Sequence, residues 1–399
     1  MPTRRTKRGA DRTSLTGDYD VLVCGASFAG LAVARELAGS GARTLVVDRY
    51  EVGERQTSAC GIPTSWLEAM DLMGSHRQTF PELVINTPFG RTVWDLPWTF
   101  STFDYRELCA LLADQGEFEF DTAKVDGRTG NTVHTDRGDL TAPLIVDALG
   151  WRRVLGSGRR KHPARPGARG SAYQPPDAPL SRGLEVHPDG VGEDLEIWLN
   201  RRYVPAGYGW RFPADGELRI GVGSFDPRFH VKDTTVLLAD DLQADAVRYQ
   251  GNWIPHKLRD ATEDGVFFAG DSAGHCLPVT AEGIRTALYF GLACGRELRA
   301  VVEGRRTREE ALRRYHDFSA SHEWKFRWLL QTQKLVPRLP PRVLHHVLRG
   351  MDAKRFVDWA FGHYLEIAPP EFVDSAPRAQ NPRRSRSARV TTPAPVRAR

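Results

Sequence analysis

An apolar strand that runs straight into a glycine-bordered turn constrains this chain more than any other feature. Residues 19–24 are mostly apolar, and the turn from Gly25 to Gly30 follows without a linker. Residues 31–41 have helical spacing and end on glycine, and residues 44–47 form a second apolar run that ends at Asp48. This order of elements predicts a Rossmann-type βαβ unit at the start of the fold, with a strand, a glycine turn, a helix, a second strand and an acidic residue.

The glycine turn has the spacing G-x-G-x-x-G with one departure, because Ser27 stands at the middle glycine position. Gly25 permits a tight turn, and Gly30 permits close packing of the helix against the strand. Serine is the next smallest residue, and its hydroxyl can donate a hydrogen bond to a phosphate. The start of the helix favours phosphate, and Asp48 is placed to accept hydrogen bonds from ribose hydroxyls. These residues predict a dinucleotide site that fits either a nicotinamide or a flavin dinucleotide.

A second glycine turn later in the chain separates these two cofactors. Residues 267–274 resemble the second flavin motif of the aromatic-hydroxylase-like flavoprotein superfamily. The resemblance implies that Asp271 binds the ribityl chain, that the helix beginning at Gly283 points at the flavin ring, and that Arg106 lies beside the cofactor. FAD is therefore the predicted cofactor. The predicted cofactor-binding residues are Gly25, Ser27, Phe28, Ala29, Gly30, Asp48, Arg49, Arg106, Gly270, Asp271, Gly283 and Ile284.

Three further segments narrow the resemblance to the geranylgeranyl reductase family. Residues 204–213 resemble its Y-x-W-x-F-P segment, residues 279–284 resemble its P-x-T-x-E-G-I segment, and Cys60 begins a Cys-Gly pair that the family also has. The resemblance implies reduction of carbon–carbon double bonds in isoprenoid chains with reduced FAD. Arg211 and Ala214 replace the apolar residue and the lysine that are common in the family, which leaves the substrate open.

The resemblance and the local pattern together give candidate catalytic and substrate-binding residues. Tyr208, Trp210 and Phe212 alternate along one predicted strand, so their side chains share a face. That face either lines an apolar slot for a prenyl chain or belongs to the core of the sheet. Cys60 is the candidate proton donor, because a thiol in apolar surroundings stays protonated, although buried cysteines more often serve packing. Tyr208 is the alternative donor.

Other flavoenzymes share the same scaffold, so the fold by itself leaves the chemistry open. An FAD-dependent monooxygenase acting on a small hydrophobic or aromatic substrate would use the same cofactor residues while reacting with oxygen. A halogenase is disfavoured, because such enzymes need a lysine shortly after the second strand and this chain has none between Lys7 and Lys124. A non-catalytic flavin-binding redox sensor is the alternative of a different class. The favoured prediction is an FAD-dependent reductase acting on a prenyl chain or another apolar unsaturated compound.

The predicted fold class is α/β, with a Rossmann-like FAD-binding domain, an inserted antiparallel-sheet substrate domain and a helical C-terminal part. Alternating apolar residues between 184 and 225 predict the inserted sheet. Both ends are basic and poor in large apolar residues, which predicts disordered tails. The predicted divisions are 1–17 (basic tail), 18–155 with 256–305 (FAD-binding domain), 156–255 (substrate domain), 306–373 (helical region) and 374–399 (basic tail).

Composition limits the partners and the location. The net charge of +5 is concentrated at the ends without interleaved aromatic residues, so nucleic acid is not a predicted partner. Five cysteines without a CxxC pair argue against a disulfide framework or a metal site, and Cys276 and His275 are interpreted as structural. The sequence shows neither a membrane-spanning apolar run nor a signal peptide, which predicts a cytoplasmic protein. The expected electron donor is NAD(P)H or a protein, and a weak membrane-surface contact through the aromatic C-terminal helices stays open.

Overall fold

A largely parallel sheet built around the first glycine turn forms the frame of the fold. The computed structural model describes residues 13–56, 58–156 and 179–375. This six-stranded sheet has the order β17-β18-β11-β2-β3-β7, and its strand pairs are parallel except for β17 with β18. The predicted Rossmann-like unit is confirmed, with α1 (Phe28–Leu37) between β2 and β3. The strands are β2 (Val21–Cys24), β3 (Thr44–Asp48), β7 (Glu119–Thr122), β11 (Leu144–Asp147), β17 (Thr262–Glu263) and β18 (Val266–Phe268).

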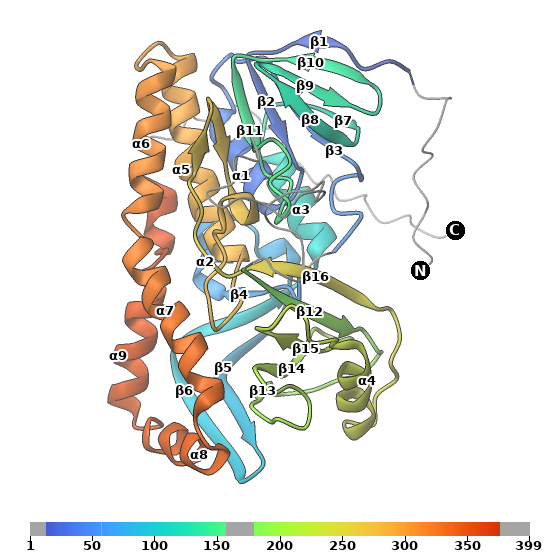
Figure 1. Ribbon diagram of the computed structural model, residues 1–399, viewed down its shortest axis with the longest axis vertical. Helices are drawn as coiled ribbons and strands as arrows, with labels where there is room; N and C mark the ends of the chain where they lie inside the picture. The colour runs from blue at the N-terminus through green and yellow to red at the C-terminus, as the bar shows by residue number, and fades with distance from the viewer. Residues whose placement is uncertain (1–12, 57, 157–178, 376–399) are drawn as a thin grey trace, which may run out of the picture.

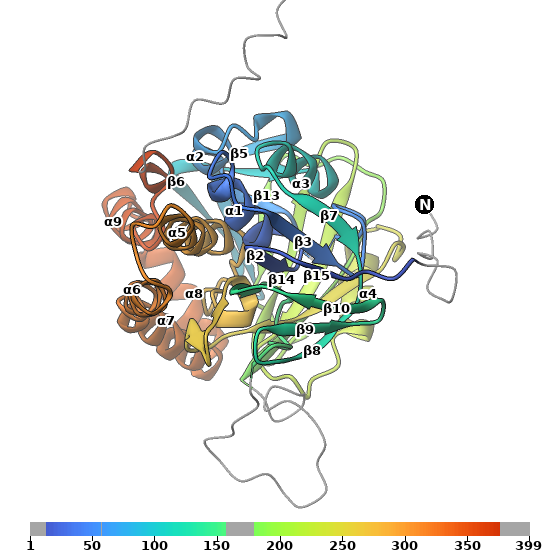
Figure 2. The same cartoon turned by 90° about the horizontal axis from the view of Figure 1, so that it is seen from above.

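Two helices pack closely on this sheet because glycines stand at their contact. α1 lies against α5 (Ile284–Val302), and the two helices are side by side in Figure 2. A Cβ atom on Gly291 would lie 2.7 Å from the carbonyl oxygen of Ala29, and one on Gly295 would lie 2.8 Å from that of Val33. The two helices therefore touch through their backbones, which an ordinary side chain at either glycine would prevent.

A small four-stranded sheet, with the order β1-β10-β9-β8, accompanies the parallel sheet. The N–H of Leu15 donates to the carbonyl oxygen of Arg137 (2.8 Å), and the Leu15 side chain is buried. Residues 13–17, which the sequence analysis assigned to the N-terminal tail, are thus held against this sheet by an apolar contact. Residues 1–12 and 376–399 of the two predicted tails lie outside the described residues. The strands are β1 (Gly17–Asp18), β8 (Val125–Thr129), β9 (Thr132–Thr135) and β10 (Gly138–Thr141).

The second large sheet has eight strands in the order β16-β12-β15-β14-β13-β5-β6-β4. Its neighbouring strands are antiparallel except for β13 with β5, which are parallel. α4 (Lys232–Asp241) covers one face, where Ile220, Val222 and Leu238 belong to a core of their own. The strands are β4 (Gly61–Pro63), β5 (His76–Thr87), β6 (Gly90–Phe103), β12 (Leu180–Val186), β13 (Leu195–Trp198), β14 (Gly207–Pro213), β15 (Leu218–Ser224) and β16 (Gln250–Pro255).

The inserted sheet is larger than its predicted segment. Strands β12 to β16 come from residues 156–255, but β4, β5 and β6 come from residues 61–103, which the sequence analysis assigned to the FAD-binding domain. The parallel pairing of β5 with β13 joins these two contributions across a long sequence separation. The predicted fold class is confirmed, whereas the division into domains stays a prediction, and residues 157–178 lie outside the described residues.

The C-terminal helices form a column along one side of both large sheets (Figure 1). Trp94 and Trp98 of β6 donate indole hydrogen bonds to the carbonyl oxygens of Leu348 (3.2 Å) and Phe361 (3.3 Å), which fixes the β5–β6 hairpin to the column. Within the part of the chain that the structure describes, every helix is too short or too polar to cross a membrane. The helices are α6 (Arg308–Ala320), α7 (Glu323–Leu335), α8 (Pro341–Gly350) and α9 (Lys354–Leu365).

Gly295→Ala and Gly362→Ala are expected to change stability in opposite directions. Both glycines lie inside helices, where alanine stabilises by about 0.5–1 kcal/mol if space allows. At Gly362 the added Cβ would meet no described atom within 4 Å, so this variant should be the more stable one. At Gly295 it would force α5 away from Val33 and should destabilise by about 1–3 kcal/mol. Urea unfolding followed by circular dichroism measures both, and a stabilised Gly295→Ala variant would contradict the close helix contact.

Candidate active site

A cavity of about 1570 Å³ lies where the two large sheets and the C-terminal helices meet. Ligand pockets commonly measure about 300–1,000 Å³, so this cavity has room for a cofactor together with a substrate. Polar groups from the two glycine turns gather in one part of it, and apolar side chains line most of the remainder. The cavity therefore divides into a polar end and an apolar end.

The first glycine turn has a backbone that other residues would obstruct. Gly25 has a φ of 115°, and a Cβ atom there would lie 2.2 Å from the carbonyl oxygen of Ala148. A Cβ on Gly30 would lie 1.9 Å from the Gly25 carbonyl oxygen. Both glycines shape the turn from behind the cavity wall, and the start of α1 forms the wall itself, where its free N–H groups favour a phosphate. The wall residues at this point are Ser27, Phe28 and Ala29.

Asp48 ends β3 inside the cavity wall. Its carboxylate accepts hydrogen bonds from the N–H groups of Ala26 (2.9 Å) and Tyr50 (3.0 Å), which joins the strand end to the glycine turn. Burial raises the pKa of Asp48, and these backbone hydrogen bonds oppose that shift. Arg49 also lines the cavity, and its buried Nε has no hydrogen-bond partner among the described residues. A buried guanidinium nitrogen without a protein partner fits a polar group of a ligand.

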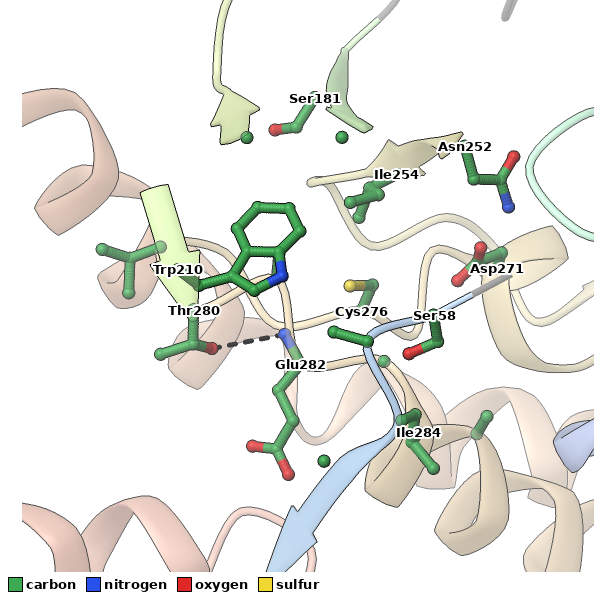
Figure 3. A pocket seen from close by; sticks show the side chains of 18 of the residues that line it. Ser58, Ser181, Trp210, Asn252, Ile254, Asp271, Cys276, Thr280, Glu282 and Ile284 are labelled. Carbon is green, nitrogen blue, oxygen red and sulfur yellow. Dashed lines mark hydrogen bonds between the residues drawn. The ribbon is translucent and has the colours of Figure 1, made fainter. Parts of the chain in front are cut away.

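The second glycine turn packs directly against the start of α1. Gly270 has a φ of 63°, and a Cβ there would lie 2.9 Å from the nearest Cβ of α1. Asp271 follows and lines the cavity, and burial raises its pKa to about 6 against the influence of Arg259. α5 begins beside this turn at Ile284, which lines the cavity (Figure 3), and the preceding Gly283 lines the cavity as well.

Arg106 is a predicted cofactor residue that the structure places outside the cavity lining formed by the described residues. It is exposed in the first turn of α3 (Tyr105–Asp114), and its backbone packs against Gly53, where a Cβ would lie 2.9 Å from the Arg106 Cα. The preceding residue, Tyr105, lines the cavity instead, with its hydroxyl 3.1 Å from that of Ser27. Neighbouring residues of a helix point in different directions, so one of the two must turn away.

Tyr208, Trp210 and Phe212 share one face of β14, and that face lines the cavity. Their ring centroids are 6.0 Å and 6.5 Å apart along the strand. Gly221 of the neighbouring strand leaves room for the indole, since a Cβ there would lie 2.2 Å from Trp210 Cζ2. Arg211 points to the other face, where it pairs with a glutamate of β13. The aromatic face therefore belongs to the cavity wall and not to a closed core.

Two cysteines differ in their access to the cavity. Cys60, the predicted proton donor, is fully buried, and its thiol donates to the carbonyl oxygen of Ser58 (3.1 Å). Its backbone has a left-handed φ of 55°, and its neighbours Ala59 and Gly61 line the cavity while Cys60 does not. Cys276, interpreted from the sequence as structural, lines the cavity (Figure 3). Burial raises the pKa of both thiols well above its usual range, so both stay protonated.

Apolar side chains extend the cavity away from the glycine turns. The β5–β6 hairpin supplies one wall and α7, α8 and α9 supply the facing wall, and the two tryptophan hydrogen bonds of the hairpin hold these walls together. This part of the cavity offers a long apolar space with few polar groups. Its lining includes Leu83, Ile85, Trp94, Leu96, Trp98 and Phe100 of the hairpin, and Trp328, Leu329, Leu344, Leu348 and Phe361 of the helices.

The loop that precedes α5 ties the polar end to the C-terminal helices. Val279 and Ala281 have left-handed φ values of 64° and 54°, which side chains with a Cβ rarely adopt. Glu282 lines the cavity and forms a paired ion contact with the fully buried Arg285 (2.7 and 2.9 Å). The hydroxyl of Tyr364 in α9 also donates to the Glu282 carboxylate. This contact fixes α9 relative to the start of α5.

Several cavity residues lie outside the residues that the sequence analysis named. Tyr105 is adjacent to Arg106, and Glu282 lies within the segment 279–284, so both residues are next to or inside a recognised sequence motif. Glu185 and Tyr364 had no such signal, because nothing in their local sequence separates them from ordinary strand and helix residues. Their place in the cavity comes from contacts between distant segments.

The polar end of the cavity fits FAD by its own geometry. The start of α1 offers free backbone N–H groups to a pyrophosphate, and Gly25 and Gly270 let the two glycine turns pack closely around it. Asp48 and Asp271 provide acceptors on two sides, and Arg49 provides a buried donor without a protein partner. Acceptors and a buried donor of this kind suit the polar groups of FAD.

Comparisons with known proteins agree with this geometry. Residues 18–135 match the family described as FAD binding domain. The chain is 25% identical over 340 residues to digeranylgeranylglycerophospholipid reductase 3 of Methanosphaera stadtmanae, which covers 76% of this chain and 83% of that protein.

Solved structures share the fold. A geranylgeranyl bacteriochlorophyll reductase-like protein from Thermoplasma acidophilum is similar with a TM-score of 0.72 and 18% identity, over 90% of this chain and 98% of that chain. A probable FAD-dependent monooxygenase from Pseudomonas aeruginosa is similar with a TM-score of 0.59 and 16% identity, over 87% of this chain and 100% of that chain. Together with the cofactor geometry, these matches show that the chain is an FAD-dependent oxidoreductase that is similar to geranylgeranyl reductases.

Proposed function

We propose that this protein reduces carbon–carbon double bonds of a prenyl chain with hydride from reduced FAD. The observation that carries this proposal is the continuity of the cavity, which runs from the glycine turns past the aromatic face of β14 to the hairpin and the C-terminal helices. An isolated alkene has no polar group to hold, so shape and apolar burial must position it. The relatives named as reductases of geranylgeranyl compounds support the same chemistry.

The predicted cofactor residues would hold FAD at the polar end. The start of α1 at Ser27 would bind the pyrophosphate, Asp48 a ribose, and Asp271 the ribityl chain. When bound, FAD supplies the two electrons of the reduction as a hydride. Arg106 would reach the cofactor only by extending its long side chain past Gly53, because its backbone lies outside the cavity wall. The chain's own side chains orient the substrate, exclude water and supply the proton.

Asp271→Asn should weaken FAD binding about tenfold or more at pH 8, because hydrogen bonds to a charged group contribute about 1.5–3 kcal/mol. Burial raises the pKa of Asp271 to about 6, so the wild-type carboxyl becomes protonated as the pH falls through that value. The difference between the two proteins should therefore shrink at pH 5. Titration of the apoprotein with FAD, followed by flavin fluorescence, measures both affinities.

Asp260→Asn is the control for this measurement. Asp260 is exposed, and only its backbone carbonyl, which the substitution leaves in place, accepts the hydrogen bond from Arg153. The control should bind FAD as the wild type does. Equal affinity of Asp271→Asn and the wild type at pH 8 would exclude the ribityl contact.

The anaerobically reduced, FAD-loaded protein should be reoxidised by a geranylgeranyl lipid. The product should be heavier by two hydrogens for each double bond reduced, because an alkene bound in the apolar end of the cavity would lie beside the cofactor. Stopped-flow absorbance of the flavin and mass spectrometry of the lipid measure the two results. Reoxidation by oxygen alone, with a product heavier by one oxygen atom, would favour the monooxygenase alternative, whose fold is similar.

We also infer that the apolar end opens toward an anionic membrane surface. Trp324, Trp328 and Trp359 are 66%, 66% and 57% exposed, and all three line the cavity as well. Between residues 323 and 365 the sequence has eight lysines or arginines against three acidic residues. Exposed tryptophans among basic residues fit the interface of an anionic lipid bilayer. A prenyl lipid could then pass from the bilayer into the cavity between these helices.

The double variant Trp324→Ala, Trp328→Ala should bind phosphatidylglycerol vesicles at least tenfold more weakly than the wild type. Each indole would lose apolar burial worth about 1.5–3 kcal/mol when fully buried. Vesicle co-sedimentation at low salt measures the binding. Val191→Ala, which removes apolar surface at an 84% exposed position elsewhere, is the matched control and should bind normally. Unchanged binding of the double variant would place the membrane contact elsewhere or exclude it.

A further inference from the structure

A row of four residues crosses the eight-stranded sheet beneath the cavity. In register across the strands stand Gln250 of β16, Glu185 of β12, Gly221 of β15 and Trp210 of β14. Because Gly221 has no side chain, the Trp210 indole lies over it and donates its Nε1–H to Glu185 (3.1 Å). The Gln250 side chain donates to the same carboxylate from the other side (2.7 Å). Glu185 is 3% exposed and lines the cavity, so the row holds a buried carboxylate against the substrate space.

A histidine connects this carboxylate to the protein surface. His187 Nε2 lies 2.9 Å from Glu185, and His187 Nδ1 lies 3.3 Å from Glu217. The Glu217 side chain is 33% exposed, whereas those of Glu185 and His187 are 4% and 7% exposed. Arg219 pairs with the same Glu217 oxygen that faces His187 (3.1 Å). We call these three side chains, Glu185, His187 and Glu217, the proton line, because their contacts run without a break from the partly exposed Glu217 to the cavity.

The charges around His187 favour a proton on both ring nitrogens. Burial disfavours the imidazolium, but the hydrogen bonds and charges of Glu185 and Glu217 outweigh it and raise the pKa of His187 to about 9. Burial likewise acts on Glu217, but His187 and Arg219 lower its pKa to about 2. Arg248 faces the histidine from the segment before β16, where it donates to the His187 carbonyl oxygen (2.5 Å). At neutral pH a protonated imidazole therefore lies between the Glu185 and Glu217 side chains.

We propose that Glu185, His187 and Glu217 conduct to the cavity the proton that each double-bond reduction consumes. The proposal rests on the prenyl reductase function proposed above. In one turnover the alkene π bond breaks and two C–H bonds form, one with the hydride from reduced FAD and one with a proton. Glu185 delivers that proton from its carboxyl oxygen after receiving it from His187. His187 then regains a proton from solvent through Glu217, which returns the line to its starting state.

Three other acidic groups near the aromatic face of the described cavity wall are less suited to this role. The Tyr208 hydroxyl is tied to the carbonyl oxygen of Thr280 (2.5 Å), and burial raises its pKa far above the usual range. The Cys276 thiol has its pKa raised in the same way. Glu282 is held by its ion pair with Arg285. A carboxyl group is a much stronger acid than a buried phenol or thiol, and Glu185 has a partner that can reprotonate it.

The first test measures the pKa of His187, the middle residue of the proton line, without any turnover of substrate. In the FAD-loaded full-length protein labelled with ¹³C-histidine, the His187 signal is assigned with His187→Gln, and its pKa is read from a pH titration by NMR. The wild-type pKa should be about 9. It should fall in Glu217→Gln and in Glu185→Gln, because each removes one of the two charges that hold the imidazolium. A wild-type pKa near the ordinary 6.5 would overturn the proposal.

The second test follows the anaerobic reoxidation of the reduced enzyme by a geranylgeranyl lipid. General acid catalysis contributes about 10²–10⁴-fold, so Glu185→Gln should slow reoxidation by roughly that factor while FAD content and lipid affinity stay unchanged. The wild-type rate should show a solvent deuterium isotope effect and fall as the pH rises through 9. Glu217→Gln, at the exposed end, should shift this pH profile downward and provides the same test if Glu185→Gln does not fold.

Glu193→Gln, an exposed glutamate in the loop after β12, is the matched control and should behave as the wild type. Wild-type rate and isotope effect in a folded Glu185→Gln would refute the proton line while leaving the reductase function standing. Loss of turnover in Tyr208→Phe with normal turnover in Glu185→Gln would move the donor to Tyr208. A wild type that leaves every prenyl lipid unchanged would refute the proposed function, and the role of the proton line with it.

Discussion

At Gly25 and Gly30 the backbone lies too close to a neighbouring carbonyl group for a side chain, at Gly270 it packs against the Ala29 side chain, and the position of the cavity depends on these contacts. They bring the start of α1 against the second turn. The buried Asp147 reinforces the junction, because its carboxylate accepts hydrogen bonds from the Ser272 hydroxyl and from the backbone after β11. Such close contacts make the polar end of the cavity rigid, and a rigid site suits a cofactor whose hydride must be held in a fixed position relative to the substrate.

The apolar end is built differently, from side chains of elements far apart in the sequence. The β5–β6 hairpin and the C-terminal helices meet there, joined by the indole hydrogen bonds of Trp94 and Trp98. The Glu282–Arg285 ion pair and the Tyr364 hydroxyl connect these helices to the start of α5. Side-chain walls adapt in shape and length more easily than backbone turns, so one scaffold accommodates different apolar substrates.

The two large sheets divide the proposed chemistry between them. Residues for the hydride-carrying cofactor come from the six-stranded sheet, and the proposed proton line comes from the eight-stranded sheet. His187 is kept charged inside the protein by Glu185 and Glu217, because an isolated buried charge would be too costly. The substrate space lies between the sheets, where a double bond would receive the hydride from one side and the proton from the other.

The sequence by itself determined the features that depend on short-range spacing. The glycine turns, Asp48 and the shared face of Tyr208, Trp210 and Phe212 follow from turn geometry and strand periodicity, which act within a few residues. Tertiary structure decided the remainder. In the folded protein Cys60 is buried away from the cavity, the β5–β6 hairpin belongs to the eight-stranded sheet, and Glu185 lines the cavity. Each of these outcomes depends on which distant strands and helices pack together. Local propensity carries no information about such pairings.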